Sequence, residues 1–141
     1  HALTTLGASV RLVGPPTLLP RSFAGVPANA ENVSISHDLD AELPDLDAIM
    51  MLRIQHERLG RAVMPSSREY AAFYGLDLAR LERARPEVLV MHPGPINRGV
   101  EIEGDIADGA QSVILEQVTN GLAVRMAVLF LVTGGRAEDA A

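Results

Sequence analysis

The sequence predicts an α/β protein in which a parallel sheet carries helices on both faces. Two continuous apolar runs, 48–52 and 88–91, have the length and composition of buried strands. The segment between them, 66–87, has the pattern of a helix. Strands that alternate with helices favour parallel pairing and a sheet covered by helices. We therefore expect 48–52 and 88–91 to lie side by side as parallel strands.

The first half of the chain is predicted to hold short elements separated by turns. Residues 1–6 have the pattern of the last turns of a helix, which Gly7 closes as a C-cap. Asp38 is a candidate N-cap for a helical turn that ends at Pro44. The strands expected in this half are 10–13 and 33–36, with a loop between them.

The second half is predicted to hold two longer helical segments. The first is 66–87, and Gly75 is a point at which it can break. The second is 111–133, where apolar side chains recur with the helical period after a polar loop rich in Gly and Asp. We assign residues 1–136 to one domain and residues 137–141 to a frayed tail.

The composition restricts the class of ligand. The chain has 141 residues, a formal net charge of -6 at pH 7 and a pI near 5.1. Nucleic acid and anionic membranes both need basic patches, so neither is expected as a main partner. The chain has no cysteine, which excludes disulfides and thiolate metal sites. A small anionic substrate held by one or two arginines is compatible with this charge.

The ends of the chain show no targeting signal. The first ten residues have neither a charged region nor a long apolar region of the kind that signal peptides carry. The apolar run 126–132 is far shorter than the ~20 residues of a membrane span. The chain does not start with Met, and its first residues already have a helical pattern. We expect it to begin inside a helix of a longer protein.

Arg53 and Gln55 directly follow the predicted strand 48–52, and both lie on one side of the chain if the extended period continues. An arginine fork pairs with a carboxylate, and a glutamine amide adds a donor or an acceptor. This pair is typical of a site for a small carboxylate ligand. The alternative is a structural ion pair between Arg53 and Glu57, and both interpretations can hold together.

His92-Pro93-Gly94-Pro95 directly follows the predicted strand 88–91. Two prolines around a glycine stiffen the backbone and can hold carbonyls outward as acceptors for ligand N–H groups. The alternative is a rigid turn after a strand. His92 is interpreted as structural, because no second histidine or carboxylate lies beside it to suggest a metal site. The carboxyl ends of parallel strands meet at one edge, so this loop and the arginine segment are expected to converge on one ligand.

Other polar residues are interpreted as structural. Glu69 and Tyr70 are expected at the surface or between domains, and His37 in solvent. Asn120 and Arg125 are expected to serve packing and ion pairing in the last helix. The sequence has no dinucleotide-binding glycine loop, no P-loop, no catalytic triad and no metal-spaced histidines. The residues alone therefore predict an α/β half-site for a small anionic ligand and do not name a reaction.

Three segments, in this order and spacing, resemble the aspartate-binding half of the aspartate carbamoyltransferase family. They are MMLRIQHER, HPGPINRGVEI and SVILEQVTNGLAVRMAVL. The resemblance covers nearly the whole chain. Ornithine carbamoyltransferases carry S-M-G and H-C-L-P motifs at these places, and neither motif occurs here. The resemblance implies a Rossmann-like C-terminal domain that binds L-aspartate.

The resemblance also assigns roles to five residues. Arg53 matches the arginine that grips an aspartate carboxylate, with Gln55 beside it. Pro93, Gly94 and Pro95 match the loop whose carbonyls hold the carbamoyl amide and the attacking amine. The Gly94–Pro95 bond is expected to be cis, as it is in the family.

The implied reaction is attack of the aspartate amine on carbamoyl phosphate, with no metal and no organic cofactor. The S-T-R-T and H-P-x-Q motifs of the family's N-terminal carbamoyl-phosphate domain do not occur here, so no complete catalytic set is expected in this chain. The family implies a cytoplasmic homotrimer. Its last helix reaches across to the N-terminal domain, and residues 69–70 match a loop that closes over aspartate. The alternative is a non-catalytic aspartate-binding or assembly module related to carbamoyltransferases.

Overall fold

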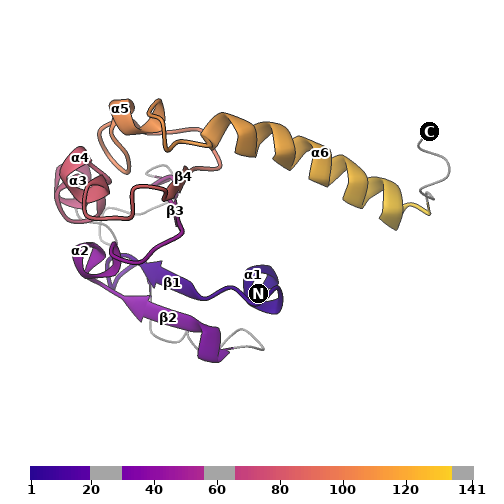
Figure 1. The fold of residues 1–141 in the computed structure, drawn as a ribbon, viewed down its shortest axis with the longest axis horizontal. Coiled ribbons are helices and arrows are strands. Elements are labelled where there is room, and N and C mark those ends of the chain that lie inside the picture. Colours follow the sequence, from indigo (N-terminus) through magenta and orange to yellow (C-terminus); the bar gives the residue numbers. More distant parts are fainter. Residues whose placement is uncertain (20–29, 56–65, 135–141) are drawn as a thin grey trace.

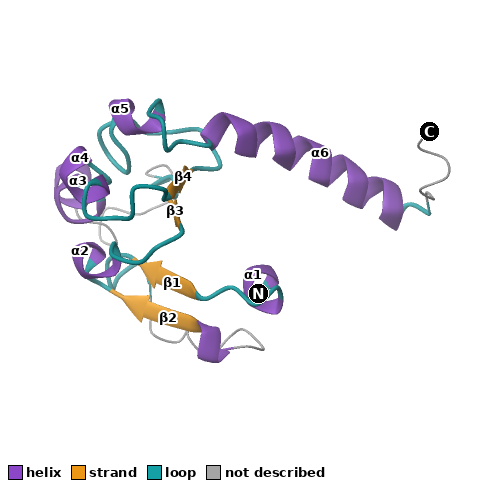
Figure 2. Ribbon diagram, viewed as in Figure 1, coloured by secondary structure: helices purple, strands orange, loops and turns teal. Residues whose placement is uncertain are grey.

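The computed structural model describes residues 1–19, 30–55 and 66–134. Short helices and parallel strands form the body, and one long helix extends away from it (Figures 1 and 2). The α/β class is confirmed. Two elements, η2 and α5, lie where the sequence predicts loops, because a single helical turn has no periodic apolar signal. The elements are α1 (Ala2–Thr5), β1 (Val10–Val13), η2 (Ala30–Asn32), β2 (Val33–Ser36), α2 (Leu39–Glu42), β3 (Ala48–Met50), α3 (Ser67–Tyr74), α4 (Leu78–Leu81), β4 (Leu89–Met91), α5 (Gly104–Ala107) and α6 (Ile114–Val132).

The strands form two parallel pairs. β1 pairs with β2, and β3 pairs with β4. The prediction that 48–52 and 88–91 are adjacent parallel strands is therefore confirmed. Among the described residues these pairs are two separate parallel sheets, since no ladder joins them. The pairs are held together by packing instead, since Val13 of β1 and Leu46 before β3 both lie against the common core.

Capping residues begin or end three of the short helices, and two of these caps, Gly7 and Asp38, were predicted. Gly7 follows α1 with φ of 87°, the left-handed conformation that a helix-closing glycine adopts. Asp38 accepts a hydrogen bond from the N–H of Ala41 at 3.1 Å and so caps α2. Ser66 accepts from the N–H of Glu69 at 3.2 Å and caps α3 in the same way.

The helical segment breaks at Gly75, as predicted, and the reason is a close approach of two backbones. A Cβ at this position would lie 2.6 Å from the carbonyl oxygen of Ala71 and 2.7 Å from that of Val100. Leu76 follows and donates its N–H to the Glu101 carbonyl at 3.0 Å. The absence of a side chain at Gly75 thus lets the α3–α4 corner rest directly on the segment around Glu101.

The core is centred on β3 and β4. It receives side chains from α2, α4, α5 and the first residue of α6, so each helix is anchored where its sequence carries an apolar residue. The buried members are Leu39, Leu43, Ile49, Met51, Leu76, Leu81, Val88, Val90, Ile102, Ile106, Ala107 and Ile114.

Arg80 is the one buried arginine among the described residues and ties α4 to two other helices. Its guanidinium donates to Asp40 in α2 and to the carbonyls of Gly75 and Ala72 at the end of α3, the last two at 2.6 and 2.8 Å. The hydrogen bond from Arg80 is the main cause that lowers the pKa of Asp40, with a smaller contribution from the charge of Arg83.

His37, just after β2, is joined to the residue after β1 and to α3. Its Nδ1 donates to the carbonyl oxygen of Gly14 at 2.7 Å, and its own carbonyl accepts from the hydroxyl of Tyr74 at 3.0 Å. His37, which was expected in solvent, is therefore only partly exposed and is held by hydrogen bonds. Its two partners, Gly14 and Tyr74, are distant in the sequence, so the local sequence pattern does not predict these contacts.

The long helix α6 is almost entirely uncovered. Only its first residue, Ile114, is buried, and the helix extends away from the body (Figure 1). Its 19 residues are long and apolar enough to cross a membrane by length and composition, a test that core helices of soluble proteins also pass. The sequence prediction considered only the run 126–132 and is corrected here, because the helix continues on the N-terminal side of that run.

The two polar residues of α6 that were expected to serve packing and ion pairing do neither. Asn120 and Arg125 are both exposed. Within the described ranges, no carboxylate forms an ion pair with Arg125. The helix therefore offers both its apolar and its polar side chains to the surroundings.

Candidate functional site

β3 and β4 deliver the two predicted ligand segments to the same edge of their sheet. Ile49 lies opposite Val90, and the N–H of Met51 donates to the carbonyl of Met91 at 2.9 Å. Because both strands run in the same direction, the segment that follows β3 and the loop that follows β4 leave the sheet side by side. The prediction that the arginine segment and the proline loop emerge at one edge is confirmed.

One hydrogen bond joins the two segments beyond the strands. Asn97, just after the proline loop, donates from Nδ2 to the carbonyl oxygen of Ile54 at 3.0 Å. Ile54 lies between Arg53 and Gln55, which are both partly buried. Glu57, the alternative ion-pair partner of Arg53, lies outside the described residues. The Asn97–Ile54 bond fixes the distance between the arginine segment and the loop.

The proline loop has the backbone that the resemblance implies. The Gly94–Pro95 peptide bond is cis, as predicted. Gly94 has a φ of 65°, a conformation that side chains disfavour, and no atom lies within 4 Å of the place where its Cβ would be. Pro93 and Pro95 are exposed on either side of it. The loop thus presents an open backbone at the edge of the sheet.

His92 and Glu101 form a fully buried pair behind this loop. Both side chains are 0% exposed, and His92 Nε2 lies 3.3 Å from Glu101 Oε1. The interpretation of His92 as a structural residue is supported by this burial. The statement that no carboxylate lies beside it is wrong, because the chain turns after the loop and brings Glu101 back onto the ring.

Hydrogen bonds orient the imidazole of His92 in this pair. The N–H of Gly94 donates to His92 Nδ1 at 2.9 Å, so that nitrogen carries a lone pair and the ring proton is on Nε2. Glu101 Oε1 accepts from Nε2–H and also from the N–H of Asn97 at 2.6 Å. The imidazole thus lies between the loop and the carboxylate and forms a hydrogen bond with each of them. Among the described residues, no group of three acidic or histidine side chains can hold a metal ion.

Tyr70 packs close to the same carboxylate. The expectation that it lies at the surface or between domains is wrong, since it is 8% exposed and its ring lies 5.5 Å from that of Tyr74. Burial, followed by the negative charge of Glu101, raises the pKa of Tyr70 to about 12. Glu69, its neighbour on α3, is exposed as expected.

Glu101 and Asn97 are site residues that the sequence reasoning missed. A signal exists, since Glu101 is a charged residue between Val100 and Ile102, both β-branched and apolar. A charge in such a setting is costly unless it is paired. The sequence pattern alone does not say which partner it has, because His92 lies nine residues away through an irregular loop.

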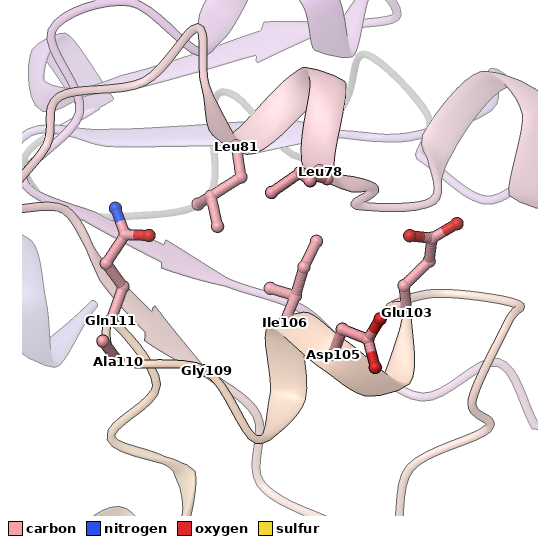
Figure 3. Close-up of a pocket in the computed structure, with 8 residues that line it drawn as sticks. All are labelled: Leu78, Leu81, Glu103, Asp105, Ile106, Gly109, Ala110 and Gln111. Carbon is pink, nitrogen blue, oxygen red and sulfur yellow. The ribbon is translucent and has the colours of Figure 1, made fainter.

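Two surface pockets in the described part of the chain lie away from the proline loop and the arginine segment. One of about 260 Å³ lies between α4 and α5, where Leu78 and Leu81 point toward Ile106 (Figure 3). The carboxylates of Glu103 and Asp105 stand at one end of it. None of the predicted ligand residues lines this hollow, so it is separate from the edge that carries the proline loop.

Comparison with known proteins gives the site a family. The aspartate/ornithine carbamoyltransferase Asp/Orn binding domain matches residues 1–132. The aspartate carbamoyltransferase catalytic subunit of Opitutus terrae is 53% identical over 141 residues, which make up 100% of this chain and 43% of that protein. The chain therefore spans less than half the length of this curated relative.

Two solved structures share the fold. Ornithine carbamoyltransferase from Pyrococcus furiosus gives a TM-score of 0.78 at 27% identity, covering 94% of this chain and 44% of that one. Aspartate transcarbamoylase from Trypanosoma cruzi, in complex with carbamoyl aspartate and phosphate, gives 0.69 at 27% identity, covering 86% and 39%. The match over residues 1–132 and the identity along the whole sequence agree: this chain belongs to the aspartate/ornithine carbamoyltransferase family, in its Asp/Orn binding domain.

Proposed function

We propose that this chain is the L-aspartate-binding part of an aspartate carbamoyltransferase. The enzyme transfers the carbamoyl group of carbamoyl phosphate to the amine of L-aspartate, giving N-carbamoyl-L-aspartate and phosphate in de novo pyrimidine biosynthesis. The observation that carries the proposal is the Asn97–Ile54 hydrogen bond, which holds the arginine segment beside the proline loop. A carboxylate and an amine of one small molecule can then be bound at the same time.

The proposed roles follow from the chemistry of the groups. The Arg53 fork pairs with an aspartate carboxylate, and the Gln55 amide adds a hydrogen bond to it. Carbonyls of Pro93, Gly94 and Pro95 accept from the amine and from the carbamoyl amide. Holding both reactants in one geometry turns a bimolecular step into an effectively unimolecular one. This chain supplies positioning and needs neither metal nor organic cofactor for it.

The groups that polarise carbamoyl phosphate are proposed to come from an N-terminal domain. Two facts support this: the chain spans 43% of the length of its Opitutus terrae relative, and it contains no S-T-R-T motif. We propose residues 1–136 as the aspartate domain of a cytoplasmic homotrimeric enzyme, on the strength of the family resemblance. The 141-residue chain alone is then inactive.

Steady-state kinetics of a full-length carbamoyltransferase that carries these residues test the proposal. Arg53→Ala is expected to weaken apparent aspartate affinity at least tenfold, because a charge-assisted pair contributes about 1.5–3 kcal/mol. Arg53→Lys keeps the charge but not the fork, so it restores affinity only in part. Carbamoyl phosphate binding changes much less.

Arg85→Ala is the matched control. Arg85 pairs with Asp47 at 2.7 Å, just before β3 and so at the opposite end of the strands. Its loss leaves aspartate saturation unchanged. Normal aspartate saturation in Arg53→Ala would mean that Arg53 serves only as an ion-pair partner. Aspartate binding without any transfer by the full-length wild type would favour the non-catalytic module instead.

A further inference from the structure

Glu101 stands at the centre of the hydrogen bonds behind the proline loop. Its side chain is 0% exposed. Oε1 accepts from the N–H of Asn97 at 2.6 Å and faces Nε2 of His92 at 3.3 Å. One carboxylate oxygen therefore holds both residues that flank the loop, one before Pro93 and one after Pro95.

On the first side, the constraint passes through the imidazole to a carbonyl. The N–H of Gly94 donates to His92 Nδ1 at 2.9 Å. This N–H belongs to the same peptide unit as the carbonyl of Pro93, and a planar trans peptide points the two in opposite directions. The Pro93 carbonyl is therefore aimed away from the buried ring. Glu101 fixes the ring and, through it, the direction of an open acceptor.

On the second side, the constraint passes through Asn97 to the arginine segment. The backbone N–H of Asn97 is held by Glu101, and its side chain donates to the Ile54 carbonyl at 3.0 Å. A shift of Glu101 would therefore move Ile54, and with it Arg53 and Gln55, relative to the loop. The His92 backbone N–H is separately tied to Gln117 Oε1 at 2.9 Å, which anchors the start of the loop to α6.

Stability alone does not account for this carboxylate. Glu101 Oε2 is buried and has no hydrogen-bond partner among the described residues. A buried charge with an open oxygen costs free energy, and apolar residues of similar volume usually give equal or greater stability. A buried polar group of this kind therefore needs a reason other than stability, and its contacts with the loop supply one.

We infer that Glu101 is a positioning residue for the carbamoyl transfer. Through His92 it aims the Pro93 carbonyl at the attacking amine, and through Asn97 it keeps the carboxylate-binding segment at the matching distance. Glu101 does not touch the substrate. The inference rests on the proposed function and adds to it the element that sets the spacing between the two binding groups.

Variants of the full-length enzyme distinguish the effect of the length of the side chain at position 101 from the effect of its charge. Glu101→Gln keeps the length and one acceptor oxygen, whereas Glu101→Asp keeps the charge but falls short of both donors. Glu101→Ala removes both. Asn97→Ala deletes only the bond to Ile54 and leaves the buried pair intact, so it serves even where a Glu101 variant fails to fold. Glu103→Gln, an exposed position two residues along, is the matched control.

Misplacement of a reactant by about 1 Å can cost on the order of 100-fold in rate. We therefore expect kcat/KM for aspartate to fall at least about tenfold in Glu101→Ala, Glu101→Asp and Asn97→Ala. Glu101→Gln stays within about threefold of the wild type, and KM for carbamoyl phosphate within about twofold in all variants. In the double variant Asn97→Ala/Glu101→Ala, kcat/KM for aspartate falls no further than in the less active of the two single variants, because both residues act through one network.

The outcomes distinguish this inference from the proposed function. If the wild type transfers no carbamoyl group to aspartate, the proposed function and the positioning role of Glu101 are both wrong. If the wild type is active and Asp at 101 performs better than Gln, charge rather than reach matters and the inference alone is wrong. The same holds if the variants lose both substrates equally in proportion to their thermal stability, since a structural role would act in that way. Aspartate-specific losses at unchanged carbamoyl phosphate KM establish the positioning role.

Discussion

Arg80 of α4 lies 3.0 Å from Asp40 of α2, measured from Nε to Oδ1, while its other nitrogens donate to carbonyls that end α3. The last carbonyls of a helix have no partner within the helix, and a buried end needs one. A guanidinium has five N–H donors in a fixed plane, enough to serve a carboxylate and several carbonyls together. One side chain thus joins three helices that surround the α3–α4 corner.

Arg80→Ala is expected to lower the free energy of unfolding by about 2–4 kcal/mol, because it leaves the buried carbonyls at the end of α3 unpaired and removes one of the two arginines that pair with Asp40. Urea unfolding of the chain measures this. Arg83→Ala is the control, since Arg83 contacts the same Asp40 at 2.9 Å but has 52% of its side chain exposed. An exposed ion pair contributes at most about 1 kcal/mol, so equal losses in the two variants would contradict the assigned role.

Gly75→Ala is expected to destabilise the chain by at least about 2 kcal/mol, because backbone atoms rather than flexible side chains occupy the space of the new methyl group. The two carbonyl oxygens at 2.6 and 2.7 Å can move only if the α3–α4 corner lifts from the segment around Glu101. Gly121→Ala is the matched substitution. No atom lies within 4 Å of its Cβ position in α6, so it stabilises the helix by about 0.5–1 kcal/mol. Thermal unfolding of the two variants distinguishes them by the sign of the change.

Local signals explain why much of the fold was predictable. The strand Val33–Ser36 is bounded by polar residues, the N-cap at Asp38 needs only its own side chain, and the break at Gly75 needs only a residue without one. The parallel neighbours β3 and β4 follow from two apolar runs separated by a helical segment. Each of these features depends on residues close together in the chain.

The missing parts depend on residues that are distant in sequence. Tyr70 was expected near the surface because the residues just before it, at the start of the helix, are all polar. Glu101 was overlooked because its partner, His92, approaches through a loop whose course no periodicity describes. The division of the described strands into two pairs was not predicted, because strands of three and four residues leave the joining of the pairs to side-chain packing. Tertiary contacts decide all three.

Tyr70 should lose its proton at a pH about two units above the ordinary value for tyrosine, since its pKa is raised from 10.0 to about 12. Below pH ~10 the neutral phenol is present in both folded and unfolded chains, and its contribution to stability is complete. Between ~10 and ~12 the unfolded chain releases the proton first, so stability falls as pH rises. Tyr70→Phe removes this alkaline loss, as unfolding free energies measured across that range would show.

Phenolate absorbance gives the site-specific control for this prediction. The chain has two tyrosines, so Tyr74→Phe leaves only the Tyr70 step, whose pKa stays raised because burial, the main cause, remains. Glu101→Gln removes the second cause of the shift and lowers that step, whereas burial, the first cause, remains. A Tyr70 that titrates at the ordinary pKa of 10 would show that its ring is not packed against the Glu101 region.

The exposed apolar side chains of α6 should make this chain self-associate. Val118, Leu122, Met126 and Leu129 recur at helical spacing and are each 54–63% exposed. An uncovered apolar stripe of this length is larger than isolated surface residues explain and favours association. Sedimentation velocity of the 141-residue chain should show concentration-dependent dimers or larger species, and an apolar dye should bind. The double variant Leu122→Glu/Met126→Glu is expected to weaken association at least about tenfold, since each charge buried at the contact costs more than 1.4 kcal/mol. Asn120→Glu adds a charge at an exposed polar position on the opposite face of the same helix and should leave association nearly unchanged. A monodisperse monomer at high concentration without dye binding would mean that α6 does not present this stripe to solvent.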